Sequence, residues 1–127
     1  MASLAAVIEQ AKRAAARAYC PYSKFPVGAA LLTKSGRVFT GCNVENASYG
    51  LTICAERAAI FNAISAGERR FETMVIYGPT TTFTGPCGAC RQVMAEFAPD
   101  FRIVMVNRAG RIKKATLRNL LPQQFSL

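Results

Sequence analysis

The spacing of three cysteines suits a metal ion with an open coordination position. Cys87 and Cys90 form a Cys-x-x-Cys pair, and residues three apart on a helix share one face, so their thiolates can bind the same ion. Alone, such a pair is equally typical of a structural zinc ribbon and of a thioredoxin-like redox site. A zinc ribbon needs a second close pair of ligands, whereas the other cysteines, Cys20, Cys42 and Cys54, are isolated. The sequence therefore favours three protein ligands and a water molecule, which is the arrangement of catalytic zinc.

Cys54 is the expected third ligand because it lies at the predicted start of a helix, as do Cys87 and Cys90. Two helix N-termini directed at one point stabilise thiolates and offset their negative charge. Arg57, in the same turn as Cys54, can add positive charge or donate hydrogen bonds to the sulfurs, but it could equally face solvent. Cys20 and Cys42 are interpreted as small apolar packing residues.

Glu56 is the candidate for proton transfer beside such a metal ion. It follows Cys54 by two residues, and in the middle of a helix these two side chains would not share a face. In the first turn a side chain can bend around the axis, so the carboxylate can lie beside zinc-bound water without binding zinc. Zinc lowers the pKa of that water, and Glu56 can then accept a proton and return protons to a substrate and a departing amine. The alternative is an ordinary acidic residue that favours a helix N-terminus.

The composition excludes several other kinds of site. The sequence has no histidine, which rules out Ser-His and Cys-His nucleophiles and every histidine-ligated metal. Its five cysteines cannot all pair within one chain, because their number is odd. Lys and Arg total 16 against 7 acidic residues, which gives a net charge of +9. The basic pairs are scattered, so a solvated basic surface is expected rather than a nucleic-acid site.

A chain of 127 residues is expected to form a single domain, residues 1–127. At this length no metal is needed to hold the fold, so a metal site suggests chemistry. No apolar run approaches the ~20 residues of a membrane-spanning helix, and the N-terminal residues lack the order of a secretory signal. We therefore expect a cytoplasmic protein with reduced thiols and no membrane association.

Strands alternate with helices along the chain, which predicts an α/β fold: a three-layer α/β/α sandwich around a mixed sheet of about five strands. Ser3 is the predicted N-cap of the first helix, Gly67 ends the second, and residues 44–51 are expected to form a loop. The strand that begins at Val27 is apolar throughout, which predicts burial on both faces. The predicted strands are Val27–Thr33, Arg37–Asn43, Thr73–Tyr77, Arg102–Asn107 and Lys113–Thr116, and the predicted helices begin at Leu4 and cover about Ile53–Ala66, Cys87–Phe97 and Leu117–Leu121.

Four segments resemble the free-nucleoside cytidine deaminases of the small homotetrameric type. They are Tyr22-Ser-Lys-Phe-Pro-Val-Gly-Ala-Ala, Gly41-Cys-Asn-Val-Glu-Asn-Ala-Ser-Tyr, Thr52-Ile-Cys-Ala-Glu-Arg and Pro86-Cys-Gly-Ala-Cys-Arg-Gln. Cys-Ala-Glu followed by Pro-Cys-Gly-Ala-Cys is the all-cysteine form of the zinc deaminase signature, in which a metal-activated water attacks C4 of cytosine. Order and spacing agree from the first predicted helix to the last.

The resemblance implies hydrolysis of cytidine and 2′-deoxycytidine to uridine and 2′-deoxyuridine, with release of ammonia, in pyrimidine salvage. It implies one zinc ion per subunit and a homotetramer with sites near subunit interfaces. The site residues it implies are Cys54, Cys87 and Cys90 for zinc, Arg57 as a partner of these cysteines, Glu56 for catalysis, Asn43 and Glu45 for the ribose 3′-hydroxyl, Phe25 for the pocket wall, the backbone of Ala55 for the base, Tyr49 for a neighbouring subunit's site and Phe125 as a cover over the base.

Two other functions remain open at this level. A related deaminase could act on a polynucleotide or on a cytosine-containing antibiotic, but the pair Asn43 and Glu45 argues against a polymer, whose 3′ oxygen is esterified. A non-catalytic zinc module could bind nucleic acid through the basic surface. That function would leave Glu56 without a role.

Overall fold

The computed structural model describes residues 1–127, and its centre is one five-stranded sheet. The strands are β1 (Gly28–Thr33), β2 (Val38–Cys42), β3 (Phe71–Tyr77), β4 (Arg102–Val106) and β5 (Ile112–Thr116). The helices are α1 (Leu4–Ala15), α2 (Ala55–Ser65), α3 (Gly88–Phe97) and the single turn α4 (Leu117–Leu120), with a 3₁₀ turn η1 at Tyr49–Leu51.

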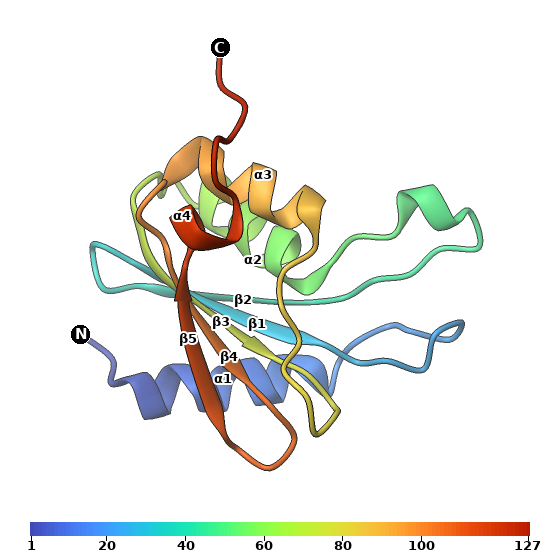
Figure 1. Ribbon diagram of the computed structural model, residues 1–127. Coiled ribbons are helices and arrows are strands. Elements are labelled where there is room, and N and C mark those ends of the chain that lie inside the picture. The colour runs from blue at the N-terminus through green and yellow to red at the C-terminus, as the bar shows by residue number, and fades with distance from the viewer.

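The sheet is mixed, and helices cover both of its faces. The strand order is β2-β1-β3-β4-β5, in which β3 and β4 run parallel and the other neighbours are antiparallel. Figure 1 shows α1 on one face and α2 and α3 on the other. The predicted three-layer α/β/α sandwich with a five-stranded mixed sheet is confirmed.

The first helix packs closely on the central strands. The side chain of Ser3 accepts a hydrogen bond from the backbone N–H of Ala6, so Ser3 is the N-cap of α1 as predicted. A Cβ atom on Gly28 would lie 1.9 Å from the carbonyl oxygen of Ala11, so only glycine at this position allows α1 to lie this close to β1. Every residue of β1 is buried, as its apolar sequence predicted.

A second close approach sets the position of α2. A Cβ atom on Gly41 of β2 would lie 2.4 Å from the carbonyl oxygen of Ala55 and 2.5 Å from the backbone nitrogen of Ala59. The first turns of α2 therefore rest directly on β2. Cys54 and Glu56 flank Ala55, so this contact also fixes the positions of the candidate metal ligand Cys54 and the candidate proton-transfer residue Glu56.

The main core lies between the sheet and the layer of α2 and α3. Its largest fully buried side chains include Phe71, Phe101 and Met74. A smaller cluster that includes Val7 and Val104 lies on the opposite face, under α1. None of the helices is both long enough and apolar enough to cross a membrane.

Several predicted boundaries were wrong by one or two residues. The second helix begins at Ala55 rather than Ile53, because Ile53 pairs with Val44 in an isolated bridge and Cys54 is the N-cap. The third strand begins at Phe71 rather than Thr73, and Phe71 contributes a ring to the core. Helix α3 begins at Gly88, with Cys87 as its N-cap.

The segment predicted as a loop at residues 44–51 contains some regular secondary structure. Val44 forms bridges with both Tyr19 and Ile53, and Tyr49–Leu51 forms the 3₁₀ turn η1. In Figure 1 this green segment extends well away from the sheet. Tyr49 and Leu51 on it are 76% and 64% exposed. This segment, residues 44–51, is called the arm, and it exposes large apolar side chains.

Candidate active site

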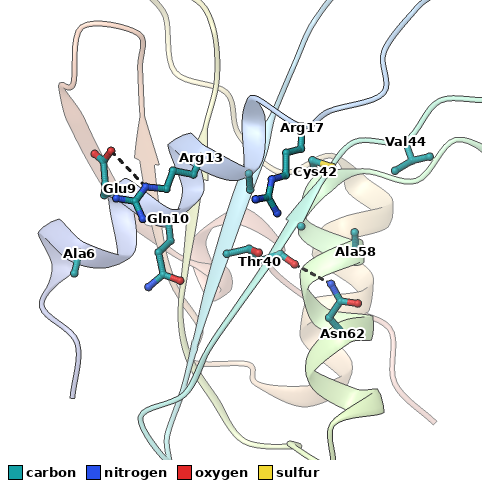
Figure 2. Close-up of a pocket in the computed structure, with 12 residues that line it drawn as sticks. Ala6, Glu9, Gln10, Arg13, Arg17, Thr40, Cys42, Val44, Ala58 and Asn62 are labelled. Atoms are coloured by element: carbon teal, nitrogen blue, oxygen red, sulfur yellow. Dashed lines mark hydrogen bonds and ion pairs between the residues drawn. The ribbon is translucent and has the colours of Figure 1, made fainter.

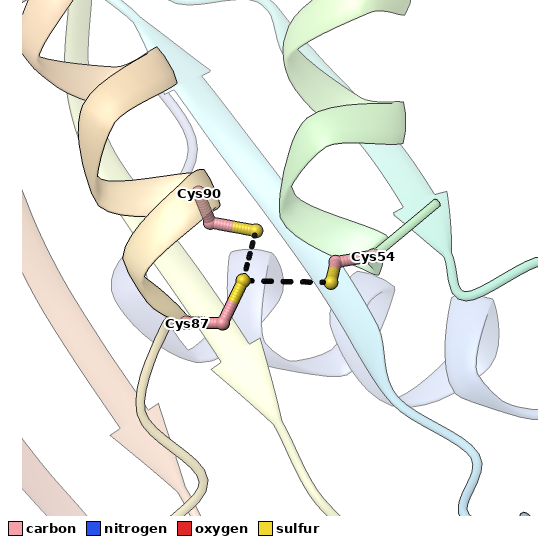
Figure 3. Close-up of side chains that lie close together, drawn as sticks. All are labelled: Cys54, Cys87 and Cys90. Atoms are coloured by element: carbon pink, nitrogen blue, oxygen red, sulfur yellow. Dashed lines mark hydrogen bonds between the residues drawn. The ribbon is translucent and has the colours of Figure 1, made fainter. Parts of the chain in front are cut away.

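The N-termini of α2 and α3 bring three cysteines together (Figure 3). Cys54 is the N-cap of α2 and Cys87 is the N-cap of α3, and neither side chain is used in a capping hydrogen bond. Cys90 lies in the first turn of α3 and is buried. Both helices thus direct the positive ends of their dipoles toward the same group of sulfur atoms, which favours thiolates.

The distances between the sulfur atoms fit a tetrahedral zinc ion. Sγ of Cys87 lies 3.7 Å from Sγ of Cys54 and 3.5 Å from Sγ of Cys90, and all three atoms lie within 4.8 Å of one another. Zinc bound to thiolates at about 2.3 Å in a tetrahedron separates its sulfur ligands by about 3.8 Å. No fourth Cys, Asp or Glu belongs to the cluster, so a water molecule or a substrate can occupy the fourth position.

Arg57 is the positive partner of the cluster. Its Nη2 atom donates a hydrogen bond to Sγ of Cys54 at 3.4 Å, and this thiol raises the pKa of the guanidinium. A hydrogen bond from Cys90, with further help from Arg57, lowers the pKa of Cys54 to about 5. Cys90 itself has a raised pKa, because its proton is shared with Cys54 and the side chain is buried. Of these two thiols, Cys54 is therefore the one with the lower pKa.

Glu56 lies beside the cluster without joining it. Its side chain is only 4% exposed, and burial raises its pKa to about 7, against the opposing effect of a hydrogen bond from its own backbone N–H. The charge of Cys54 raises this pKa further, whereas a hydrogen bond from Cys90 lowers it. A carboxyl group with a pKa near neutrality can both accept and donate a proton, which is what a general acid and base requires.

Asn43 and Phe25 lie in the loops that precede α2 and β1. The side-chain amide of Asn43 accepts a hydrogen bond from the N–H of Val27 at 2.9 Å and donates one to the carbonyl oxygen of Phe25 at 2.8 Å. Asn43 thus joins the two loops, and one N–H and one lone pair of its amide remain for a ligand. Phe25 is partly buried against the main core, and Ala55 is fully buried at the start of α2.

Glu45 also fixes the loop that contains Phe25. Its carboxylate accepts hydrogen bonds from the backbone N–H groups of Tyr22 and Ser23 at 2.9 and 3.1 Å, and from the hydroxyl of Ser23. The hydroxyl of Ser23 holds the pKa of Glu45 below its ordinary value. The carboxylate is therefore ionised at neutral pH and can accept further hydrogen bonds.

Tyr49 lies on the exposed arm, outside the cysteine cluster. Its ring meets that of Tyr22 edge-on, with centroids 6.0 Å apart. The two tyrosines, with Ser23, Glu45 and Thr52, line a hollow of about 370 Å³. Tyr49 is 76% exposed in the single chain.

Phe125 lies in the C-terminal segment that follows α4. It is 69% exposed, and its carbonyl oxygen accepts a hydrogen bond from Gln92 of α3. Gln92 follows Cys90 by two residues, which is about 200° around a helix. Gln92 and Cys90 therefore lie on different sides of α3.

A larger cavity, of about 700 Å³, lies at the free edge of β2 between α1 and α2. Figure 2 shows Arg13 of α1 and Arg17, in the turn after α1, on one side and Asn62 of α2 on the other. Nδ2 of Asn62 donates to the carbonyl oxygen of Thr40 at 2.8 Å. Cys42 lines this cavity, and its pKa is raised by burial. Neither Cys42 nor Cys20 belongs to the metal cluster.

Several residues that shape the site had not been singled out from the sequence. Gly41 allows the close packing of α2 on β2, and the hydroxyl of Ser23 donates a hydrogen bond to the carboxylate of Glu45. Arg91 donates from Nε to the carbonyl oxygen of Pro86 at 2.8 Å and thereby fixes the backbone next to Cys87. Arg91 lies in a segment that resembles the family, but its acceptor is a backbone carbonyl oxygen, which leaves no signal in the sequence.

Comparisons with known proteins agree with this geometry. The profile of the cytidine and deoxycytidylate deaminase zinc-binding region matches residues 1–107. A cytidine deaminase of Halalkalibacterium halodurans is 50% identical over 121 residues, covering 94% of this chain and 92% of the relative. A cytidine deaminase of Sporosarcina psychrophila is 47% identical over 121 residues, covering 94% and 89%.

A solved structure shows the same fold. The crystal structure of cytidine deaminase from Burkholderia pseudomallei superimposes with a TM-score of 0.94 at 50% sequence identity, covering 98% of this chain and 100% of the other. With the matched profile, the two relatives and the cysteine cluster in agreement, the chain belongs to the cytidine deaminase family.

Proposed function

We propose that this protein hydrolyses cytidine and 2′-deoxycytidine to uridine and 2′-deoxyuridine with release of ammonia, as a step of pyrimidine salvage. The observation that carries the proposal is the group of three thiols within 4.8 Å of one another, next to a carboxyl group that is 4% exposed. Its cofactor is zinc, which belongs to the matched family region and fits the donor set and spacing of Cys54, Cys87 and Cys90.

Glu56 is the catalytic residue of the proposed reaction. Zinc at a site with three protein ligands supplies an activated water at neutral pH. The Glu56 carboxylate accepts one proton from the attacking water and passes it to the cytosine ring nitrogen as the C–O bond forms at C4. It then accepts the second proton, from the new hydroxyl group, and passes it to the amino group, which leaves as ammonia when the C4–N bond breaks. The Glu56 pKa of about 7 allows both directions of transfer near neutral pH. Burial of the carboxyl group is the main cause of this raised pKa.

The remaining residues of the site bind and orient the nucleoside. Asn43 and Glu45 keep free polar atoms for the ribose 3′-hydroxyl, and Phe25 forms part of the pocket wall. The N–H groups in the first turn of α2 have no partner within the helix, so the backbone of Ala55 can contact the base. Arg57 supports the thiolates through Cys54.

The proposal includes a homotetramer formed by copies of this single catalytic domain, residues 1–127, in the cytoplasm. The exposed side chains of Tyr49 and Phe125 support assembly, since each lies outside its own chain's cluster and is free to reach a second copy. Large exposed apolar side chains on an extended arm are typical of protein interfaces.

A direct assay distinguishes the proposal from deamination of a polymer, which the net charge of +9 would suit. The purified protein is given cytidine, 2′-deoxycytidine or a cytosine-containing oligonucleotide, and ammonia release is measured. Turnover of the free nucleosides is expected, because an esterified 3′ oxygen cannot donate a hydrogen bond to Glu45. Turnover of the oligonucleotide alone would contradict the proposal.

A further inference from the structure

The C-terminal segment is held by two consecutive residues of α3. Arg91 donates from Nη1 to the carbonyl oxygen of Leu120 at 2.7 Å, and Gln92 donates from Nε2 to the carbonyl oxygen of Phe125 at 3.2 Å. The segment between Leu120 and Phe125 is therefore attached to α3 at both ends. In Figure 1 this red segment leaves α4 and runs past α3 before the chain ends.

The two ends of the segment are held to different degrees. Leu120 and Leu121 pack against the main core, and the N–H of Leu121 donates to the carbonyl oxygen of Leu117 at 2.8 Å. Beyond Leu121, the bond from Gln92 is the only hydrogen bond that involves residues 122–127. The position of Phe125 thus depends on one side chain.

The path between these anchors is a defined turn. Gln123 has a φ of 52°, which lies in the left-handed region and is uncommon for a residue other than glycine. The turn ends at Phe125, whose ring is 69% exposed although its backbone is hydrogen-bonded. Holding the backbone of an aromatic residue while its ring stays free is suited to presenting that ring to something outside the chain.

We infer that Gln92 is a positioning residue for the deamination, because it holds Phe125 where its ring can cover the base of a bound nucleoside. The inference rests on the proposed function, in which Phe125 is part of the site. Gln92 and Cys90 lie on different sides of α3, and Phe125 is exposed, so the proposal assigns this ring to the site of a neighbouring copy. Gln92 acts through Phe125 and does not touch the reacting atoms.

The first test is the variant Gln92→Met, which keeps the length of the side chain and removes the N–H donor. The KM for cytidine is expected to rise about 2- to 10-fold, the range that loss of one neutral hydrogen bond supports. The kcat and the zinc content should stay unchanged, because no zinc ligand is disturbed. The matched control is Glu96→Met, one turn further along α3, where the exposed side chain makes no hydrogen bond or ion pair.

The second test is a double-mutant cycle with Phe125→Ala. If Gln92 acts through Phe125, Gln92→Met has no further effect on KM once the ring is absent. An equal rise in both backgrounds, or an unchanged KM in Gln92→Met alone, would overturn the inference. A change in oligomeric state by sedimentation velocity would also overturn it, because Gln92 would then be an assembly residue.

The wild-type protein in the same assay distinguishes a failure of the proposed function from a failure of the proposed role of Gln92. No turnover of cytidine by the zinc-loaded wild type would overturn the proposed function and this inference together. Wild-type turnover combined with an additive cycle would overturn only the role of Gln92.

Discussion

Arg57 donates a hydrogen bond from its guanidinium to Sγ of Cys54 at 3.4 Å, from the first turn of the same helix. Cys54 is the N-cap of α2, so Arg57 and the helix dipole act on the thiol from the same direction. Nε of Arg57 is buried without a partner, which shows that the side chain is held at the cluster despite the loss of one hydrogen bond. The hydrogen bond with Cys54 and the charges of Cys54 and Cys90 raise the pKa of Arg57 and thus favour its charged form at this place.

Replacing Arg57 should weaken zinc binding. Arg57→Gln removes the positive charge that helps to lower the pKa of Cys54, and zinc affinity is expected to fall about 10–100-fold, as for other partners of metal ligands. Zinc retention against a competing chelator measures the effect. Arg13→Gln, an exposed residue of α1, is the control. Equal retention by Arg57→Gln and the wild type would show that the guanidinium does not support the metal.

Gly41→Ala should destabilise the fold at the seat of α2. The added Cβ would lie 2.4 Å from the carbonyl oxygen of Ala55, and overpacking of this kind costs about 1–3 kcal/mol. The free energy of unfolding from urea titration measures the loss. Gly50→Ala is the matched control, because nothing lies within 4 Å of its added Cβ. Equal stability losses for the two variants would contradict the proposed close contact.

Ser23→Ala should shift the acid limb of substrate binding. The hydroxyl of Ser23 lowers the pKa of Glu45, so in the wild type the carboxylate stays ionised until the pH falls below the ordinary range of a glutamate. Any stability from this ionised group is present above the unfolded-state pKa and is lost as the pH falls through the lower folded-state value. Without the hydroxyl, the pKa of Glu45 rises. As the pH is lowered, the KM for cytidine should therefore begin to increase at a higher pH in Ser23→Ala than in the wild type.

The measurement is KM as a function of pH, with the zinc content determined at each point because acid also protonates the thiolates. Ser35→Ala is the control, since Ser35 donates a similar hydrogen bond to Glu68 at the turn before β2. Superimposable acid limbs for Ser23→Ala and the wild type would show that the ionisation of Glu45 does not govern binding.

The metal cluster could be anticipated from the sequence because its chemistry restricts residue type and local spacing. Cys87 and Cys90 are related by one helical turn, and Cys54 and Glu56 by the start of another. The fold class could be predicted for a similar reason, since apolar periodicity and turn residues are local signals. The β1 strand, fully buried and apolar throughout, is the clearest example.

Contacts with backbone carbonyl groups could not be predicted. Arg91 bonds to Pro86 and Leu120, and Gln92 bonds to Phe125, but every residue offers a carbonyl oxygen, so the acceptors leave no mark in the sequence. The bond between Ser23 and Glu45 joins residues 22 positions apart and depends on the fold. The order in the arm likewise follows from bridges of Val44 with Tyr19 and Ile53.

The most direct test of the account is the turnover of Glu56→Gln with zinc bound. Glutamine keeps the shape of the side chain but cannot accept and return a proton, so kcat for cytidine should fall by about 10²–10⁴-fold or more. Because Glu56 lies outside the metal cluster, the variant should retain the zinc content of the wild type. Ammonia release at near wild-type rate by the zinc-loaded variant would contradict the central claim that Glu56 transfers the protons of the deamination.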